Sequence, residues 1–343
     1  MSLRIAITGT GAIADLHAQE LDAIRGVELC ACCDVSHSKA RDFALRHKIK
    51  NLYLNIEDML QREKPDAIII AVPPYAQLKA CLIAIEHKVH ILCERPLTNN
   101  SRDAAKLARL ANEAELVNIV SYETRGIPEV HKAANLVKAG RLGKIMHIEA
   151  SYLQSWLSTH TLGNWKTSES LLWRMTQKFG GHGVIDDLGL TLLDCVDFIA
   201  GEINTIDVSK RSFRKDVPGN RLGDTQLDAS DSAVIMAEMK GGALGSFHLS
   251  RWATGEINSL RLRVYGDKGG LSLKIKDGIP SLRLCTGPDR QNGLWSEIEC
   301  PLVPNIWRSF INAIRKHDTT LEPNFSSAYN IHKLLTSTKK ETD

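Results

Sequence analysis

The sequence of 343 residues lacks an apolar run long enough to cross a membrane, which requires roughly 18 residues. The longest apolar run, residues 67–72, has the length of a strand and ends at two prolines. At the N-terminus, residues 1–5 lead directly into a hydrophobic strand, without the long apolar stretch and small-residue cleavage site of a secretory signal. We therefore expect a cytoplasmic protein that has no membrane partner.

The sequence also lacks a strong excess of charge of either sign. Its 43 lysines and arginines stand against 40 aspartates and glutamates, a net charge of +3, and the basic residues are scattered. This pattern argues against nucleic acid as a partner, because nucleic-acid binding needs a concentrated basic surface. The content of 43% hydrophobic and 24% charged residues is ordinary for globular proteins and excludes a disordered chain. The length suggests two domains.

The eight cysteines do not have the paired spacing of a zinc site. Three of them, Cys30, Cys32 and Cys33, are close together, but they lie in a strand-like segment. Because successive strand residues point to opposite faces, the side chains of Cys32 and Cys33 diverge. We expect buried thiols in a reducing compartment and no metal site.

The first 120 residues alternate strand and helix patterns. Strands are predicted at residues 4–8, 27–33, 67–72, 89–93 and 116–120, with a short segment at 51–54, and helices at 12–24, 36–47, 56–61, 75–87 and 101–114. Ser36 and Ser101 are the predicted caps of two of these helices. Strands separated by helices of about 10–15 residues indicate parallel βαβ units, and their nearly continuous apolar character fits a sheet covered on both faces.

After residue 121 the pattern changes. Strand-like stretches recur with turn signals between them, at residues 144–156, 205–213, 233–240, 243–251, 258–265 and 270–274. Helices are predicted at 128–139, 184–200, 306–317 and 326–335. This part of the chain therefore reads as an α+β domain with a large, mainly antiparallel open sheet.

The segment Gly9-Thr10-Gly11-Ala12-Ile13-Ala14 has the form G-x-G-x-x-A. It follows a strand and opens a helix inside a βαβ unit, which is the context of a dinucleotide-binding fingerprint. Gly9 permits the tight turn, Gly11 lets the backbone approach a pyrophosphate, and the helix N-terminus faces the phosphates with free N–H groups. The sequence thus predicts a Rossmann domain over residues 1–121 and an α+β domain over residues 122–343.

Asp34 ends the second predicted strand, 23 residues after Gly11. A carboxylate at this position accepts hydrogen bonds from the adenosine ribose and repels a 2′-phosphate, which favours NAD. His37 and Lys39 lie near enough to leave NADP open. A helix cap is the alternative role of Asp34.

Further short motifs follow one another along nearly the whole chain. They are Ala71-Val72-Pro73, Cys93-Glu94-Arg95-Pro96-Leu97, Arg125-Gly126-Ile127-Pro128, the segment 140–145 and the glycine-rich segment 180–189. Together with the fingerprint, they resemble the glucose–fructose oxidoreductase and inositol dehydrogenase (Gfo/Idh/MocA) family. The resemblance implies hydride transfer between NAD or NADP and a sugar, sugar derivative or cyclitol, and association of subunits through the open sheet.

The resemblance also implies which residues form the site. The turns after residues 72 and 93 lie at the carboxyl ends of strands, where an open α/β sheet binds ligands. The further cofactor-binding residues implied are Val72, Pro73, Glu94, Arg95 and Glu123, and the substrate residues implied are Tyr122, Arg174 and His160. For Arg174 a surface position is the alternative.

Two positions depart from the family pattern. Arg95 stands where the family has a lysine, and Thr191 stands where the Asp-x-Gly-x-His motif that begins at Asp187 has its histidine. An arginine keeps the charge but is a poor acid or base, and a threonine does not titrate near neutrality. His182, before the same predicted helix, is a candidate base, with capping or packing as the alternative. We therefore expect Arg95, Asp187, His182 and Thr191 to form the catalytic set, with Asp187 or His182 as the proton acceptor.

These departures leave two functions open. The leading prediction is an NAD(P)-dependent dehydrogenase or reductase that acts on CH–OH groups, and the alternative is a sensor or regulatory protein that binds dinucleotide and sugar without turnover. Alternating apolar residues on the strands after residue 205 predict an exposed sheet face that joins a homodimer or homotetramer. These residues are Val234, Met236, Phe247, Leu249, Leu262 and Val264.

Overall fold

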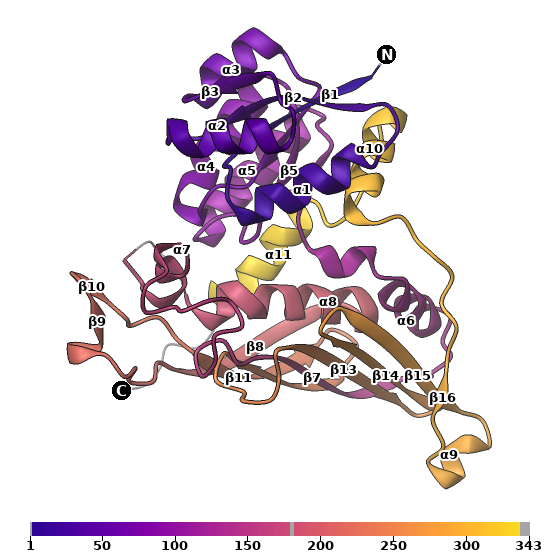
Figure 1. Cartoon of the computed structure of the whole chain (residues 1–343). Coiled ribbons are helices and arrows are strands. Elements are labelled where there is room, and N and C mark those ends of the chain that lie inside the picture. The colour runs from indigo at the N-terminus through magenta and orange to yellow at the C-terminus, as the bar shows by residue number, and fades with distance from the viewer. Residues whose placement is uncertain (1, 179–181, 337–343) are drawn as a thin grey trace. The chain divides into compact units, whose positions relative to one another are not determined.

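The computed structural model describes residues 2–178 and 182–336, and the chain divides into two compact units, each with its own large sheet (Figure 1). The first unit comprises residues 1–123 together with 304–332. The second comprises residues 124–303 and the residues from 333 onward. The segment 304–332 thus belongs to the first unit, whereas the sequence pattern placed it in the second domain.

The first unit contains a parallel sheet of six strands in the order β3-β2-β1-β4-β5-β6. The strands are β1 (Leu3–Thr8), β2 (Val27–Cys33), β3 (Asn51–Tyr53), β4 (Ala67–Ile70), β5 (His90–Cys93) and β6 (Asn118–Val120). The helices between them are α1 (Ala12–Asp22), α2 (His37–Arg46), α3 (Ile56–Glu63), α4 (Pro74–Glu86) and α5 (Ser101–Glu113). The prediction of a Rossmann sheet is confirmed, and its strand order reverses at β1 and β4, where such sheets bind ligands.

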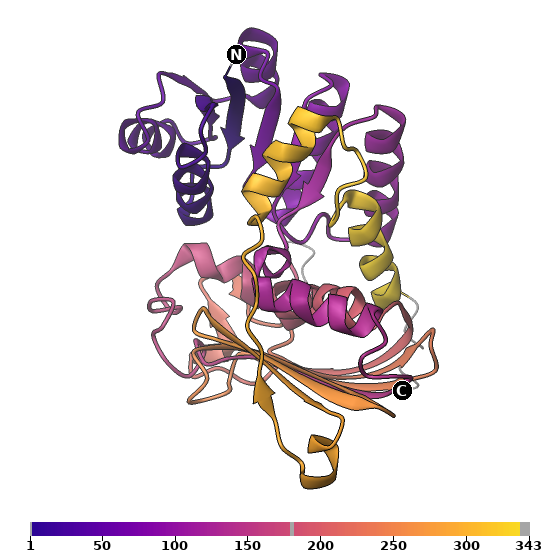
Figure 2. The ribbon, with the colours of Figure 1, turned by 90° about the vertical axis from the view of Figure 1, so that its right-hand side faces the viewer.

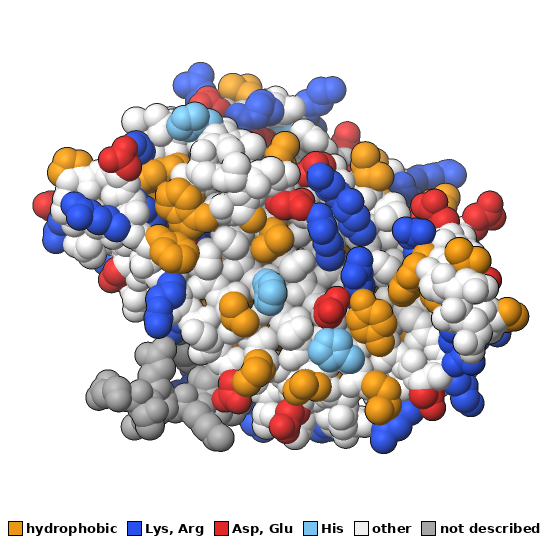
Figure 3. Space-filling model, turned by 90° about the horizontal axis from the view of Figure 1, so that it is seen from below, with side chains coloured by type: hydrophobic (Ala, Val, Ile, Leu, Met, Phe, Trp, Pro, Cys, Tyr) orange, Lys and Arg blue, Asp and Glu red, His pale blue; other side chains and the backbone are white. Residues whose placement is uncertain are grey.

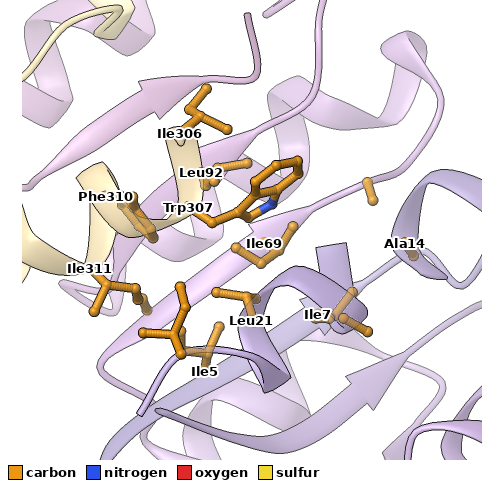
Figure 4. Close-up of a cluster of buried hydrophobic side chains, with 14 of the residues drawn as sticks. Ile5, Ile7, Ala14, Leu21, Ile69, Leu92, Ile306, Trp307, Phe310 and Ile311 are labelled. Atoms are coloured by element: carbon orange, nitrogen blue, oxygen red, sulfur yellow. The ribbon is translucent and has the colours of Figure 1, made fainter. Parts of the chain in front are cut away.

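The core of the first unit is completed by a helix from the end of the chain, α10 (Ile306–Lys316). The helix lies against the sheet of the first unit (Figure 2). Its buried residues recur at the spacing of one helix face, and they pack against residues of β1, β4 and α1 (Figure 4). Trp307, Phe310 and Ile311 lie among Ile5, Leu21 and Ile69 in this cluster (Figure 4). The last helix, α11 (Phe325–Thr336), begins in the same unit.

The second unit contains a sheet of eight strands in the order β16-β15-β14-β13-β7-β12-β11-β8. The strands are β7 (Ile145–Gln154), β8 (Ile203–Arg211), β11 (Ser232–Met239), β12 (Leu244–Ser250), β13 (Asn258–Gly266), β14 (Gly269–Lys276), β15 (Ile279–Thr286) and β16 (Ser296–Glu297). Only the β7–β12 pair of this sheet is parallel, so the predicted mainly antiparallel sheet is confirmed. Strand β7 lies in the middle of this sheet, where it pairs with β12 and β13, about 100 residues later in the sequence.

Helices α6 (Pro128–Lys138) and α8 (Leu190–Ala200) pack on one face of this sheet. A short π-helix, Ile185–Gly189, leads into α8 and packs on β7 and β12. The smaller elements are α7 (Glu169–Leu172), α9 (Asp289–Asn292), the hairpin of β9 (Arg221–Leu222) and β10 (Thr225–Gln226), and 3-10 turns at Glu123–Gly126, Trp173–Met175 and Pro218–Asn220.

The other face of the sheet is exposed and mixed in character (Figure 3). Of the six apolar residues expected there, only Val234 and Met236 are exposed, at 50% and 58%. The other four are buried on the helix-covered face, where Leu249 lies against Gly189 of the π-helix: Phe247, Leu249, Leu262 and Val264. The expectation for these four was wrong because alternation along a strand separates two faces but does not say which face is covered.

Several local features differ from the sequence prediction. Asn100, not Ser101, caps α5, because its side-chain oxygen accepts a hydrogen bond from the Asp103 N–H at 2.9 Å. The strand β15 was not predicted. The predicted cap of α2 is confirmed, since the Ser36 side chain accepts the Lys39 N–H.

Candidate functional site

The turn between β1 and α1 contains two glycines with different structural roles. Gly9 has a φ of +83°, and a Cβ there would lie 2.3 Å from the carbonyl oxygen of Ala71, so only glycine fits. Gly11 has a φ of −79°, and a Cβ there would meet no described atom of the chain within 4 Å. Among the described residues no side chain caps α1 at Gly11. Open space in front of an uncapped helix N-terminus is compatible with a bound pyrophosphate.

Asp34 stabilises this turn through hydrogen bonds. One of its carboxylate oxygens accepts hydrogen bonds from the backbone N–H and the hydroxyl of Thr10, at 3.0 and 2.8 Å. The other oxygen accepts the Ser36 N–H at 2.9 Å. The cap of α2 is Ser36, so Asp34 does not occupy the cap position. Its half-buried carboxylate therefore stands beside the Gly9–Gly11 turn, where an adenosine ribose is expected.

The predicted nicotinamide residues lie at the carboxyl ends of three adjacent strands. Val72 and Pro73 follow β4, and Pro73 is the residue before α4. Arg95 follows β5 and is half-buried. After β6, Tyr122 is fully buried, whereas Glu123 is exposed. Desolvation, together with the charge of Glu94, raises the pKa of the Glu123 carboxyl.

Glu94, also at the end of β5, is held by a histidine that sequence reasoning missed. Its carboxylate oxygen lies 3.0 Å from Nε2 of His17, a fully buried residue of α1. Nδ1 of His17 accepts the indole N–H of Trp307 at 2.8 Å. A lone histidine on an apolar helix face gives no signal of such a partner in the sequence. Burial raises the pKa of Glu94, but the His17 hydrogen bond and the Arg95 charge outweigh it and hold the pKa below its ordinary value.

In the second unit, Asp187 lies in the π-helix between two guanidinium groups. Arg174 Nε is 3.3 Å from one carboxylate oxygen, and Arg251 Nη2 is 3.1 Å from the other. Arg251 is fully buried, donates to the backbone carbonyl of Arg174 at 2.8 Å, and lies over the ring of Trp156. Burial lowers the pKa of Arg251, and the charge of Asp187 opposes this shift. The structure thus brings Asp187 and Arg174 together, and it adds Arg251, which no motif in the sequence indicated.

His182 lies close to Asp186, the residue before Asp187. Its ring Nδ1 is 3.3 Å from the Asp186 carboxylate, and its backbone N–H donates to the same carboxylate at 2.7 Å. The side chain of His182 is 51% exposed, whereas that of Asp186 is buried. The hydrogen bond to Asp186 raises the pKa of His182 above its ordinary value, against the opposing effect of partial burial. A carboxylate on one ring nitrogen leaves the other nitrogen able to accept a proton.

Two other predicted residues lie outside this arrangement. Thr191 is buried in α8, and its hydroxyl has no hydrogen-bond partner among the described residues. His160 is exposed in the loop after β7, where its carbonyl accepts the Gly163 N–H. Gly180 and Gly181 of the glycine-rich motif lie outside the described residues.

All eight cysteines are free thiols, with no disulfide between them. Cys30, Cys32 and Cys33 are buried in β2, and burial raises their pKa values to about 11, 12 and 11. Within the described ranges, no group of three or more His, Cys, Asp or Glu side chains is arranged to hold a metal ion. No helix in those ranges is both long and apolar enough to span a membrane.

The two glycines lead to a first prediction. Serine at position 11 should leave the fold intact, because the φ is ordinary and serine is a favoured residue at a helix N-terminus. The Gly11→Ser variant should bind NADH at least about tenfold more weakly, since its side chain enters the space for the pyrophosphate. Titration with NADH, followed by fluorescence or calorimetry, measures the affinity.

The matched control is the other glycine. Gly9→Ala should destabilise the protein, by roughly 1–3 kcal/mol from the positive φ alone. Thermal unfolding of the two variants separates these effects. Binding of NADH by Gly11→Ser as tightly as by the wild type would contradict the assignment of this turn.

Two family models match the chain. The model described as "Oxidoreductase family, NAD-binding Rossmann fold" matches residues 3–122, and the "GFO/IDH/MocA C-terminal domain" model matches residues 130–272. These matches correspond to the six-stranded sheet and to most of the eight-stranded sheet. They therefore cover both of the regions that contain the candidate site residues.

Individual relatives are more distant. Levoglucosan dehydrogenase of Pseudarthrobacter phenanthrenivorans is 22% identical over 253 residues, which are 69% of this chain and 62% of that protein. Myo-inositol 2-dehydrogenase of Thermotoga maritima is 23% identical over 267 residues, 78% of this chain and 74% of that protein. A solved structure of levoglucosan dehydrogenase with NADH and levoglucosan has a TM-score of 0.86 at 18% identity, over 97% of this chain and 95% of that one. The chain therefore belongs to the Gfo/Idh/MocA family of oxidoreductases, whose N-terminal domain is an NAD-binding Rossmann fold.

Proposed function

We propose that this protein is an NAD(H)-dependent dehydrogenase that acts on one CH–OH group of a sugar, sugar derivative or cyclitol. The observation that carries the proposal is the Gly9–Gly11 turn, where packing requires Gly9 but leaves open space at Gly11. Relatives named for levoglucosan and myo-inositol support the substrate class. When bound, NAD supplies the hydride acceptor of this chemistry.

The cofactor is assigned to the carboxyl edge of the first sheet. The N–H groups of Ala12 and Ile13 at the start of α1 bind the pyrophosphate, and Asp34 accepts hydrogen bonds from the adenosine ribose. The nicotinamide lies at the ends of β4, β5 and β6. Its neighbours are Val72, Pro73, Glu94, Arg95 and Glu123.

The substrate proton is assigned to His182. Asp186 accepts a hydrogen bond from Nδ1 of His182, an arrangement in which a carboxylate orients an imidazole base. Both oxygens of Asp187 face guanidinium groups, so this carboxylate is compensated by charge and serves to hold Arg174 and Arg251 in place. Arg95 keeps a positive charge at the position of the family lysine, where it orients the substrate oxygen without exchanging a proton.

This assignment predicts a specific pH dependence. The raised pKa of His182 means that the imidazole is neutral, and able to accept a proton, only above a pH higher than its ordinary value of about 6.5. Oxidation should therefore accelerate as the pH rises through this pKa. Asp186→Asn removes the main cause of the raised pKa, so the acid limb of the kcat profile should move to lower pH.

The test is a kinetic comparison of His182→Gln with Asp187→Asn on a panel of sugars, sugar acids and cyclitols, with the NADH dissociation constant measured alongside. His182→Gln should lower kcat by roughly 10²–10⁴-fold and leave NADH binding unchanged, because it removes a positioned base. Asp187→Asn should act mainly through KM, because it loosens the two arginines.

Two results would contradict the assignment. If Asp187→Asn loses kcat by the larger factor while His182→Gln does not, the base is Asp187. If the wild type binds NADH but turns over no member of the panel, the sensor or regulatory alternative replaces the dehydrogenase. In that case the replacement of the family lysine and histidine by Arg95 and Thr191 would explain the missing turnover, because a protein that still binds NADH has kept its fold.

We further propose that the exposed sheet face joins two copies of the chain. It carries Val234 and Met236 on β11 and Leu244 on the neighbouring strand β12, all of them at least half exposed. Met236→Glu should shift the protein toward monomer in light scattering at micromolar concentration, because it places a charge in the interface. Leu302→Glu is the control, since Leu302 is 94% exposed and lies outside the sheet strands. A wild-type monomer would refute the proposal.

A further inference from the structure

Three polar side chains from three elements of the first unit form a hydrogen-bonded chain through its core. Trp307 of α10 donates its indole N–H to Nδ1 of His17 in α1, at 2.8 Å. Nε2 of His17 lies 3.0 Å from the carboxylate of Glu94, directly after β5. His17 and Trp307 are buried, and the side chain of Glu94 is 14% exposed. These three hydrogen-bonded side chains therefore connect the core helix α10 with the edge of the sheet where the nicotinamide is proposed to bind.

The partners of His17 allow only one tautomer. An indole nitrogen is a donor and never an acceptor, so Nδ1 of His17 must present its lone pair to Trp307. The proton of the neutral ring is then on Nε2, which donates to Glu94. A second proton would have to sit on Nδ1, directly against the Trp307 N–H. The packing of α10 on α1 thus excludes the charged imidazolium as well as the other tautomer.

Few charged side chains lie near the hydrogen-bonded residues Trp307, His17 and Glu94. Arg95 follows Glu94, and its positive charge favours the ionised carboxylate. Glu123 is close enough for its pKa to be raised by Glu94. On α1, Glu20 lies one turn after His17, and it accepts a hydrogen bond from Asn305 at 2.8 Å. The backbone carbonyl of Glu94 accepts the Gln77 amide at 2.7 Å, which fixes the residue from its other side.

We propose that His17 and Trp307 are positioning residues that hold Glu94 as an anion in one orientation, through the one tautomer of His17 that the Trp307 N–H allows. The proposal rests on the proposed function in one respect, the place of the nicotinamide beside Glu94. A fixed negative charge there favours the positively charged ring of NAD⁺ over the neutral ring of NADH. It also makes this preference independent of pH across the neutral range, where an ordinary histidine changes charge.

The first experiment reads the tautomer directly and needs no cofactor. Nitrogen-15 NMR of the histidine rings follows His17 between about pH 5.5 and 8.5, the range in which a free imidazole titrates. Comparison with His17→Gln assigns its signals. In the wild type, Nδ1 should remain unprotonated and Nε2 protonated throughout. In Trp307→Phe, His17 should titrate, because the missing N–H frees Nδ1 and leaves room for a water molecule.

Phe310→Leu is the matched control. Phe310 is buried in the same helix and packs in the same cluster, but it makes no polar contact with His17 (Figure 4). This variant should lose stability and keep the wild-type tautomer. A wild-type His17 that titrates in this range, or that carries its proton on Nδ1, overturns the proposal. So does a Phe310→Leu variant that titrates as Trp307→Phe does.

The second experiment measures the dissociation constants of NAD⁺ and NADH across the same pH range. Their ratio should stay constant in the wild type. In His17→Leu, Glu94 loses its donor, and NAD⁺ binding should weaken about three- to tenfold relative to NADH as the pH falls, because Glu94 becomes protonated. His17→Gln should restore the constant ratio, since its amide donates to Glu94, accepts from Trp307 and does not titrate.

The outcomes separate this proposal from the proposed function. A pH-independent ratio in His17→Leu overturns the positioning role of His17. Failure of the wild type to bind either nucleotide overturns the proposed function instead, and the NMR result then still decides whether the histidine is locked.

Discussion

The close approach of Gly9 to the carbonyl of Ala71 is the contact on which the nucleotide site depends. Strands β1 and β4 are neighbours, and their carboxyl ends meet so closely that a Cβ at Gly9 would lie 2.3 Å from the Ala71 oxygen. Only glycine fits at position 9, because any side chain would clash with this carbonyl. The turn that follows directs α1 toward the point where the strand order reverses. Thr10 then comes within reach of Asp34, which bonds its backbone and its side chain.

Charge compensation is the corresponding constraint in the second unit. Buried charges are retained in folded proteins when they are paired, and removal of one partner costs several kcal/mol. Asp187 is paired with Arg174 and Arg251, and Lys215 and Asp231 form a fully buried ion pair at 2.8 Å. The two arginines thus compensate the charge of the Asp187 carboxylate. The half-exposed His182 is the group in this region that combines access with a carboxylate partner.

Apolar periodicity was enough to predict the Rossmann sheet and most strands of the second sheet, because most of these elements bury residues at the spacing expected for their type. The return of α10 to the first unit could not be predicted, since an amphipathic helix shows that it has a partner but not which partner. The same limit applies to the pairing of Arg251 with Asp187 and of His17 with Trp307. Those residues are far apart in the sequence, and only the packing of the elements brings them together.

The site could be predicted where a local motif determines its own geometry. The Gly9–Gly11 turn and the position of Asp34 follow from strand, turn and helix signals within one βαβ unit. Proton transfer could not be assigned in this way, because it depends on which charges surround each candidate. The structure separates Asp187, which faces two arginines, from His182, which is oriented by Asp186.

The most direct test of this account is a calorimetric titration of the wild-type protein with NADH and, separately, with NADPH. The Asp34 carboxylate is proposed to face the adenosine ribose, so a 2′-phosphate would meet a negative charge that Thr10 and Ser36 hold in place. We therefore expect NADH to bind at least about tenfold more tightly, a difference of about 1.4 kcal/mol. Equal or tighter binding of NADPH would contradict it and would point to Ser36, His37 and Lys39 as phosphate ligands.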